Sequence, residues 1–399
     1  MPFASALSTQ PTTPAALSEV CARIQATMPE PPDLVLAFFS PQHGDQAELL
    51  ARGLVETLRP SILLGSIGEA IVGTGREVER APALSVWAAR WARPVTQTAF
   101  HLTYERTGDG LTLLGWPDVL GGVTAEPTPE PFVPTRTAVL LLGDPFTFPT
   151  EAFLERMNTE VRGVPVLGGM ASGISEAGQV RLLHGGTVHQ SGAVGVVLQG
   201  ELGLRSIVSQ GCRPIGRPLV ITKAEENVIL ELGGRTPFDH LRQLWDDLTP
   251  EEQALFQKGL HIGRVLNEYQ GEFQRGDFLV RNVLGIERQS GALVITDHVR
   301  RGQTVQFHVR DAASADEDLR ALLQLDLHAN EKRPAGGLLF SCNGRGTRLF
   351  DRPDHDAEAI RQEMGELPLA GFFAMGELGP VGGQNFIHGF TASVALFED

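Results

Sequence analysis

Apolar runs that end in small polar residues recur three times along the chain. Each run is short enough for a buried strand, and each is followed by a segment whose apolar residues return at helical spacing. A second apolar run, which ends in glycine or other small residues, follows each helical segment. Because a helix between two strands favours a β-α-β connection, this order predicts a sheet covered by helices. The first runs are residues 34–45, 138–149 and 336–346, and the second runs are residues 61–73, 164–175 and 368–379.

A third apolar run closes each copy, so the order is an internal repeat, too irregular in spacing for a solenoid. The first and second copies are separated by GGVTAEPTPEPFVPTRT, whose four prolines are typical of a linker or an edge crossing. An insertion over about residues 200–330 separates the second and third copies and has strand and helix patterns of its own. The predicted fold class is therefore α/β to α+β, with repeated strand-helix-strand units that form helix-covered sheets.

The amino-acid composition limits the classes of partner that the protein can bind. The 399 residues include 48 acidic and 33 basic side chains, so the formal net charge is −15. A chain this acidic, with no run of lysine or arginine, repels phosphate backbones, and we expect no nucleic-acid partner. The first residues lack the basic and apolar regions of a signal peptide, and no stretch is apolar enough to span a membrane. These features predict a cytoplasmic protein without a membrane contact.

The three cysteines, Cys21, Cys212 and Cys342, are far apart and odd in number. They form neither a disulfide framework nor a C-x-x-C zinc motif, so we expect no metal and no cofactor. Cys212 and Cys342 lie in similar segments, SQGCRPIG and SCNGRG, which each combine a serine, an amide and an arginine with glycine. Arginine in such a segment suits a carboxylate. Each thiol is either a small buried side chain or a nucleophile that needs a nearby base or positive charge.

Glycines crowd the C-terminal stretch MGELGPVGGQNFIH. The stretch matches no nucleotide-binding loop and leads into a strand, so a tight turn explains the glycines better than a phosphate site does. That turn does not explain Glu377. The corner that Glu377 occupies in the third copy is occupied by Glu69 in the first and by Ser172 in the second. A carboxylate just past a buried strand either caps backbone amides or faces a ligand cation. The acids of DRPDHDAE, by contrast, are explained as helix caps and first-turn charges.

These segments together resemble the FIST family, which pairs an N-terminal and a C-terminal FIST domain in bacterial signalling proteins and some F-box proteins. The most specific match is LAGFFAMGELGPVGGQNFIHGFTASVALF, and SCNGRG, FLVRNVLGI and VQFHVRD support it. In the N-terminal half, GSIGEAIVG, LLLGDPFTFP, VLGGMASG and GAVGVVLQGELGLRSIVSQGCRPIG follow the family's order. The resemblance implies an N-terminal extension (1–30), a FIST N domain (31–210) and a closely associated FIST C domain (211–399).

The resemblance implies a sensory, signal-transducing module that binds a small ligand, with amino acids suggested by the family's genomic neighbours. Family members often stand beside kinase, cyclase or chemotaxis output domains; we expect none in this chain, so a separate signalling protein or oligomer contacts would carry the signal. Ser66 stands where relatives often have cysteine, which makes shared thiol chemistry at that corner doubtful. The positions that the family pattern marks as ligand-binding candidates are Gly211, Cys212, Arg213, Ser341, Cys342, Asn343, Arg345, Glu377, Gly379, Gly382, Gly383, Asn385 and His388.

The leading hypothesis is a cytoplasmic sensor of an amino acid or a similar small zwitterion. Arg213 and Arg345 would bind the carboxylate of this ligand and Glu377 its ammonium group, in a mostly apolar pocket. One alternative is an enzyme in which one of the two motif cysteines is the nucleophile, with His388 as base and glycine amides as an oxyanion site. Another alternative is a scaffold that binds no ligand. The sequence leaves all three open.

Overall fold

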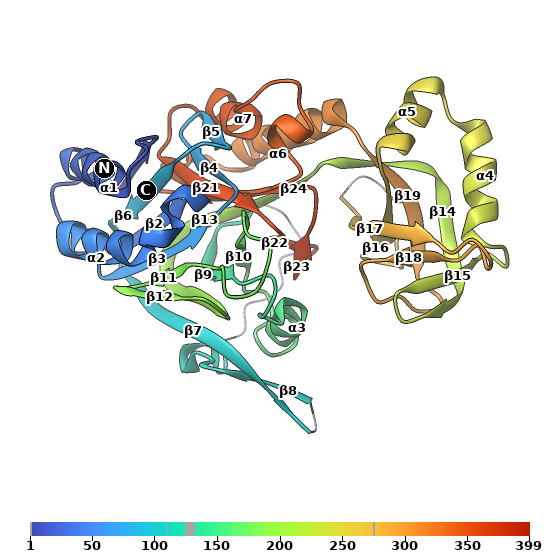
Figure 1. Ribbon diagram of the computed structural model, residues 1–399, viewed down its shortest axis with the longest axis horizontal. Helices are drawn as coiled ribbons and strands as arrows, with labels where there is room; N and C mark the ends of the chain where they lie inside the picture. Colours follow the sequence, from blue (N-terminus) through green and yellow to red (C-terminus); the bar gives the residue numbers. More distant parts are fainter. Residues whose placement is uncertain (1, 109, 124–131, 274–275) are drawn as a thin grey trace. The chain divides into compact units, whose positions relative to one another are not determined.

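The fold is that of a computed structural model, which describes residues 2–108, 110–123, 132–273 and 276–399 (Figure 1). The chain forms two compact units with several sheets and helices, as the mixed α/β class predicts. The first unit consists of Met1–Ser209 with Leu319–Asp399, and the second is Gln210–Asp318. Residues 124–131, which belong to the expected proline-rich linker, lie outside the described residues. Within the described ranges, no helix is long and apolar enough to cross a membrane.

A six-stranded sheet in the first unit contains the start of the chain. Its elements are β1 (Phe3–Ser8), β2 (Leu34–Phe39), β3 (Ile62–Ile67), β6 (Leu84–Ala89), β11 (Leu182–His184) and β12 (Thr187–His189), with helices α1 (Thr13–Thr27), η1 (Pro41–Gln46) and α2 (Ala47–Leu58). The strand order is β1-β6-β2-β3-β11-β12, with β2 and β3 parallel. Residues 1–30, the expected extension, contribute β1 and the helix α1 that packs on it.

A twelve-stranded sheet in the first unit joins segments from distant parts of the chain. Its strands are β4 (Ala70–Gly73), β5 (Arg76–Glu79), β7 (Val95–Thr107), β8 (Gly110–Leu114), β9 (Thr135–Gly143), β10 (Val166–Met170), β13 (Ala193–Gln210), β20 (Gly336–Cys342), β21 (Leu369–Ala374), β22 (Glu377–Val381), β23 (Gln384–His388) and β24 (Thr391–Phe397). The order is β23-β22-β10-β9-β13-β24-β20-β21-β4-β5, and β7 pairs with β13 and β8. Because β4 pairs with β21, the hairpin β4–β5 from the first half of the chain lies beside the strands that follow residue 336.

Three strand-helix-strand connections in the first unit share one topology. Their remaining elements are α3 (Thr150–Glu160) and α7 (His355–Met364), and the unit also contains η2 (Asp118–Leu120), η3 (Gly346–Arg348) and most of α6 (Ala312–Ala329). In β2-α2-β3, β9-α3-β10 and β20-α7-β21, the two strands are parallel neighbours. A later strand (β6, β13 or β24) pairs antiparallel with the first strand of each. Parallel neighbours end at the same edge of a sheet, so the loop after β20 lies beside the end of β21.

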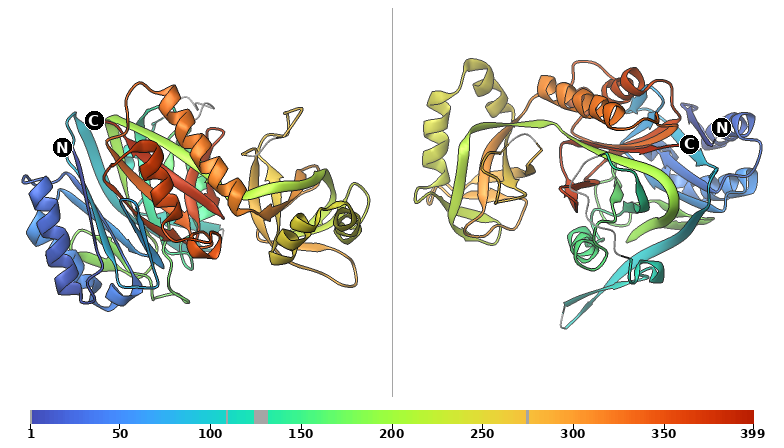
Figure 2. Two further views of the ribbon diagram at one scale, coloured as in Figure 1. Left: turned by 90° about the horizontal axis from the view of Figure 1, so that it is seen from above. Right: turned by 180° about the vertical axis from the view of Figure 1, so that it is seen from behind.

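The two sheets of the first unit pack against each other through aromatic side chains. Phe38 of β2 stacks on Phe372 of β21, with ring centroids 5.3 Å apart, and meets Phe340 of β20 edge-on at 6.1 Å. Because successive side chains of a strand point to opposite faces, Leu339 packs on the other face, in the core that α6 and α7 share. Figure 2 shows these two helices along one side of the red strands. Strands β20 and β21 are therefore buried on both faces, which explains their continuous apolar runs.

The second unit is built on a closed six-stranded barrel of order β14-β15-β18-β17-β16-β19. Its elements are β14 (Cys212–Glu225), β15 (Val228–Leu232), α4 (Pro237–Asp247), α5 (Pro250–Lys258), β16 (Leu260–Val265), β17 (Phe278–Ile286), β18 (Leu293–Ile295) and β19 (Thr304–Arg310). Ile215, Ile262 and Phe307 lie in its core, and Leu241 of α4 packs with them. The second half of β17 alternates between exposed and half-buried positions, whereas β19 is buried at every position except Arg310.

Candidate functional site

The candidate site lies in the loop that follows β20, where the chain reads SCNGRG. Ser341 and Cys342 end β20, and because strand side chains alternate, they point to opposite faces of the sheet. The backbone N–H of Asn343 donates to the carbonyl of the last residue of β21 (3.0 Å) and holds the start of the loop there. Gly346 has a φ of +55°, and a Cβ on it would lie 2.6 Å from the Phe373 ring. The loop therefore requires glycine at this position.

Arg345 belongs to this loop, and its side chain is fully buried. Its Nε and Nη2 donate to the two carboxylate oxygens of Asp356 at 2.7 and 2.8 Å, a bidentate pair. The Ser341 hydroxyl donates to Asp356 Oδ2 (2.8 Å), and His355 Nδ1 lies 2.9 Å from Oδ1. Burial alone would raise the pKa of Asp356, but the Arg345 guanidinium holds it well below its usual range. The fork of Arg345 is thus occupied by a carboxylate of the protein itself.

Glu77 of β5 lies against the first turn of α7. Its Oε1 accepts hydrogen bonds from the backbone N–H groups of Asp356 and Ala357, both at 3.0 Å, where the positive end of the helix favours a carboxylate. Its Oε2 has no hydrogen-bond partner among the described residues. Burial, and then the negative charge of Asp356, raise the pKa of Glu77 well above its ordinary value. The surroundings of Glu77 therefore favour its protonated form over its charged form.

Glu377, at the start of β22, is also fully buried. Its Oε2 accepts hydrogen bonds from the backbone N–H (3.1 Å) and the hydroxyl (2.8 Å) of Thr391. Its Oε1 has no N–H or O–H partner in the described part of the chain. Burial raises the pKa of Glu377 to about 8, against smaller lowering effects of Thr391, of a hydrogen bond with the Cys342 thiol and of the Arg345 charge. Glu377 is thus a second buried acid, and it lies beside a thiol.

Cys342 lies where several groups that favour a thiolate converge. The backbone N–H of Gly344 points at its sulfur, with a nitrogen–sulfur distance of 3.4 Å. The charges of Arg345 and Arg348 both interact with a thiolate at this position. Hydrogen-bond donors and cations are the groups that make a cysteine reactive. Cys342 is not part of a disulfide and keeps 7% of its surface, whereas the neighbouring Glu377 has none.

A small hollow opens at the surface above this loop. Its volume is about 10 Å³, which admits about one water molecule. Side chains from four separate segments meet around it: the turn between β3 and β4, the end of β5, the loop after β20, and β21. The lining residues are Glu69, Ala70, Glu79, Arg80, Asn343, Arg348 and Phe373.

An ion pair between Arg348 and Glu69 crosses this hollow. Arg348 Nη1 lies 3.0 Å from Glu69 Oε2, and Nη2 contacts Oε1. Arg348 Nη1 also donates to the Asn343 carbonyl (2.6 Å), and the Glu69 backbone N–H donates to the Ser172 hydroxyl (2.8 Å). The side chains of Arg348 and Glu69 keep 44% and 31% of their surface, so both charges remain within reach of solvent. Because this pair is exposed, a ligand could open it at low cost.

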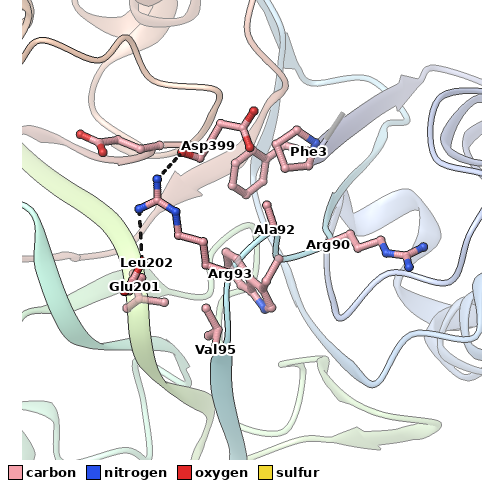
Figure 3. A pocket seen from close by; sticks show the side chains of 11 residues that line it. Phe3, Arg90, Ala92, Arg93, Val95, Glu201, Leu202 and Asp399 are labelled. Carbon is pink, nitrogen blue, oxygen red and sulfur yellow. Dashed lines mark hydrogen bonds and ion pairs between the residues drawn. The ribbon is translucent and has the colours of Figure 1, made fainter.

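A larger hollow, of about 20 Å³, lies elsewhere on the first unit, where the start of β7 meets the two ends of the chain (Figure 3). Arg93 reaches across it toward the Glu201 carboxylate (3.5 Å) and the Asp399 backbone carbonyl (3.4 Å). These are long contacts between exposed groups, which contribute little free energy. None of the residues predicted from the sequence lines this hollow, and we place the candidate site at the loop after β20.

Family models match the chain in two consecutive blocks. The FIST N domain matches residues 33–235, and the FIST C domain matches residues 237–380. The chain belongs to the FIST family. Uncharacterized protein MT0656 of Mycobacterium tuberculosis is 44% identical to it over 371 residues, 92% of each chain. Uncharacterized protein Mb0898c of Mycobacterium bovis is 42% identical over 370 residues, 93% of this chain and 92% of its own.

FIST domains are generally sensory and signal-transduction domains, which is the coarse function of this chain. The two family matches meet at residues 235–237, between β15 and α4, inside the second compact unit. The boundaries of the compact units therefore differ from the boundary between the two family matches. The first unit combines most of FIST N with the C-terminal part of FIST C, and the hollow at the candidate site is lined by residues of both.

The predicted residues of the C-terminal stretch have mainly structural contacts. Asn385 Oδ1 accepts from the Val166 backbone N–H (2.7 Å) and its Nδ2 donates to the Val164 carbonyl (2.9 Å), which ties β23 to the start of β10. His388 Nε2 lies 3.0 Å from the Gly379 carbonyl oxygen across the β22–β23 hairpin. Gly382 and Gly383 form the turn of that hairpin with φ values of +58° and +76°. The predicted tight turn is thus present, and Glu377 stands at its base.

The remaining predicted residues lie in the second unit. Gly211 precedes β14, and Cys212 is buried at the start of that strand. Arg213 is partly exposed and binds Asp311 (Nε to Oδ2, 2.9 Å) and Glu252 (Nη1 to Oε1, 3.1 Å). Each unit therefore has its own Cys–Arg segment, and both arginines already have carboxylate partners.

Several residues of the site, among them Asp356, Glu77 and Arg348, were not predicted from the sequence. Asp356 belongs to DRPDHDAE, where it was interpreted as a first-turn acid, but its side chain binds Arg345. Glu77 is 279 residues from the backbone amide that it caps, so no local pattern could reveal it. Arg348 could have been considered, because it follows Arg345 by three residues in a glycine-rich loop.

Proposed function

We propose that this protein is a sensory module that binds a small zwitterion, such as an amino acid, at the hollow above the loop after β20. The observation that carries the proposal is the half-exposed ion pair between Arg348 and Glu69. A zwitterion replaces both partners of this pair at once, because its carboxylate takes the guanidinium fork and its ammonium group takes the glutamate. No buried charge is left without a counterion in the exchange.

The charges of the site support surface residues rather than buried ones in these roles. Arg345 cannot offer its fork to a ligand without leaving Asp356 as an unpaired buried charge, which costs several kcal/mol. Glu377, with a pKa of about 8, keeps its proton at neutral pH and offers no charge to an ammonium group. Arg348 and Glu69 have neither restriction, and Glu79 adds a second carboxylate at the edge of the hollow.

With a volume of about 10 Å³, the hollow is too small for an amino acid while the Arg348–Glu69 pair is intact. Binding of an amino acid must therefore open this pair. An exposed pair contributes only about 0–1 kcal/mol, so opening it costs little. Glu69 comes from the FIST N match and Arg348 from the FIST C match. A ligand between them would therefore change the contact between two distant segments of the first unit, and a separate signalling protein would read that change.

The first experiment looks for the ligand directly. The protein is purified without additions and denatured, and released small molecules are sought by mass spectrometry; in parallel, the intact protein is melted with each of the twenty amino acids. A ligand at about 100 times its Kd adds about 2.7 kcal/mol of stability, which raises Tm measurably. The proposal predicts a released zwitterion or a Tm increase with at least one amino acid. If no small molecule is released and no amino acid raises Tm, the scaffold alternative is favoured.

Two substitutions test the assignment of the charges. Arg348→Ala should weaken amino-acid binding about 10- to 100-fold, since a hydrogen-bonded charge contributes about 1.5–3 kcal/mol. Glu69→Gln should weaken binding of the amino acid but not of the matching simple carboxylate, because only the ammonium partner is lost. Arg23→Ala, which removes an exposed ion pair with Glu19 far along the sequence, is the matched control and should bind normally. Equal affinity of Arg348→Ala and the parent would refute the site.

A further inference from the structure

We propose that Cys342 is a peroxide-reactive thiol and that Glu377 is its proton donor, so that the protein also responds to small hydroperoxides. This inference goes beyond zwitterion binding and does not depend on it. It concerns Cys342 and Glu377, which the ligand proposal does not use and which do not line the hollow.

Cys342 is not an isolated cysteine. The Gly344 N–H points at the sulfur from 3.4 Å, and Arg345 and Arg348 both interact with a thiolate there. Glu377 hydrogen-bonds the same thiol from a site with no exposed surface. An amide N–H and two guanidinium groups stabilise negative charge on sulfur, and the carboxyl group supplies a proton next to it.

The arrangement around Glu377 suits a proton donor. One oxygen, Oε2, is fixed by both donors of Thr391. The other oxygen, Oε1, has no N–H or O–H partner among the described residues although it is fully buried. A buried polar atom without such a partner is costly and calls for an explanation. A small hydroperoxide that reaches the sulfur would bring a hydroxyl group to this oxygen. The pKa of about 8 keeps the acid protonated at neutral pH, ready to donate.

The chemical step balances with a hydroperoxide as the oxidant. After the thiol has lost its proton to solvent, the Cys342 sulfur attacks one peroxide oxygen, and the S–O bond forms as the O–O bond breaks. The departing hydroxide takes the proton of Glu377 and leaves as water. Sulfur is oxidised by two electrons to a sulfenic acid, the peroxide is reduced, and Glu377 then regains a proton from solvent.

The limited access to the Cys342 sulfur restricts the oxidant. Asn343, the neighbour of Cys342, lines a space that admits about one water molecule, and Cys342 itself keeps 7% of its surface. Hydrogen peroxide is little larger than water, whereas an alkyl hydroperoxide with a bulky substituent is not. The proposal therefore predicts faster reaction with hydrogen peroxide than with tert-butyl hydroperoxide.

The test uses the other two cysteines as internal controls. The reduced protein is treated with hydrogen peroxide and the sulfenic-acid trap dimedone, and adducts on the three cysteine peptides are timed by mass spectrometry. Cys21 and Cys212 are also buried, and burial raises the pKa of Cys21 to about 11. Cys342 should be trapped at least about 10-fold faster than either control, because a stabilised thiolate reacts faster. Trapping of Cys342 no faster than of Cys21 and Cys212 would overturn the proposal.

The variant Glu377→Gln distinguishes a proton-donating role of Glu377 from a purely structural role. Attack on peroxide needs a proton for the leaving group, whereas alkylation by iodoacetamide releases iodide and needs none. Loss of a positioned acid should slow the peroxide reaction of Cys342 about 100-fold and leave its alkylation nearly unchanged. Equal slowing of both reactions would show that Glu377 only shapes the loop, and would refute its role as donor.

The parent protein provides the same test if the variant does not fold. Above about pH 8, Glu377 loses its proton in the native state. The rate of Cys342 with hydrogen peroxide should then fall relative to its rate with iodoacetamide, which continues to rise with the thiolate fraction. A constant ratio of the two rates from pH 6 to about pH 10 would contradict the proton donor. Neither result depends on whether an amino acid binds above the loop.

Discussion

Arg345 and Arg213 stand in similar short segments, each close to a cysteine and a glycine, and each binds carboxylate groups. Arg345 has no exposed surface, and neither has its partner Asp356. Arg213 keeps 26% of its side-chain surface, and its partners Asp311 and Glu252 keep 20% and 23%. The two segments therefore differ in the solvent around the ion pair rather than in the residues that form it.

The exposure of an ion pair to solvent decides how much its loss costs in stability. Removal of one partner from a buried ion pair leaves an uncompensated charge at a cost of about 3–5 kcal/mol, whereas an exposed pair contributes about 0–1 kcal/mol. Buried groups such as Arg345 thus fix the loop after β20, and half-exposed groups such as Arg348 remain free to exchange partners. We expect function where a fixed loop carries exchangeable charges at its surface.

The largest expected effect is that of Arg345→Ala compared with Arg213→Ala. Arg345→Ala should lower the free energy of unfolding of the first unit by about 3–5 kcal/mol, because Asp356 stays buried without its cation. Arg213→Ala should change the stability of the second unit by about 1 kcal/mol or less. Calorimetry, which can resolve separate transitions, measures both.

A double substitution sharpens this comparison. Arg345→Met with Asp356→Leu removes both charges and keeps apolar volume, so it should recover much of the stability lost in Arg345→Ala. If Arg345→Ala and Arg213→Ala were equally mild, the buried pair would not be what holds the loop.

The pH dependence of the first unit should be the next largest effect. Glu377 has a native pKa of about 8 against an ordinary 4.5. The native state therefore keeps a proton that the unfolded state loses, and stability is full below about pH 4.5 and falls as pH rises to about 8. Glu377→Gln should reduce this fall by an amount on the order of a few kcal/mol. Glu77, whose pKa is also raised, leaves a residual slope of the same sign.

Urea unfolding at a series of pH values measures this slope. The parent should lose stability between pH 5 and about pH 8, and Glu377→Gln should lose less. A Glu377→Gln profile parallel to that of the parent would mean that Glu377 is ionised in the native state.

Asn385 and Asn343 provide the same comparison between a buried side chain and one that lines the hollow. Asn385 satisfies the backbone N–H of Val166 and the carbonyl of Val164, so Asn385→Ala should cost about 1–3 kcal/mol by leaving buried groups unpaired. Asn343 lines the hollow, and its side chain has only a distant sulfur contact, 3.9 Å from Cys342. Asn343→Ala should change stability by less than about 0.5 kcal/mol. Denaturant melts of the two variants compare them directly, and a reversed order would contradict the structural role of Asn385.

The smallest stability effect belongs to Arg348→Ala. Its partner Glu69 is half-exposed, so loss of the pair should change the free energy of unfolding by about 1 kcal/mol or less. The same substitution should abolish most of the Tm increase caused by an amino acid. A variant that is strongly destabilised, or that keeps its ligand response, would place Arg348 with the fixed groups instead.

Much of the strand pattern could be predicted, because buried strands have continuous apolar runs. Residues 34–39, 138–143 and 336–342 are strands as expected, and each is followed by a helix and a parallel strand. The strand and helix patterns of the insertion were recognised, but the difference between the half-exposed β17 and the buried β19 was not. Closure of the insertion into a barrel could not be predicted, since it depends on pairings between strands far apart in sequence.

The candidate site could be predicted only in part. Glu69 and Glu377 do occupy corresponding corners after β3 and β21, but one binds an exposed arginine and the other is buried beside a thiol. Burial is a property of the packed sheets, and the sequence pattern of the two corners is the same. The partner of Arg345 was eleven residues away and still missed, because a first-turn acid already had a sufficient local explanation.

Hydrogen exchange with and without the amino acid that most raises Tm would test the central claim most directly. The account predicts slower exchange in residues 343–348 and in the turn around Glu69, with little change at residues 211–213. Protection confined to residues 211–213, or no amino acid that raises Tm at all, would contradict a ligand site at the loop after β20.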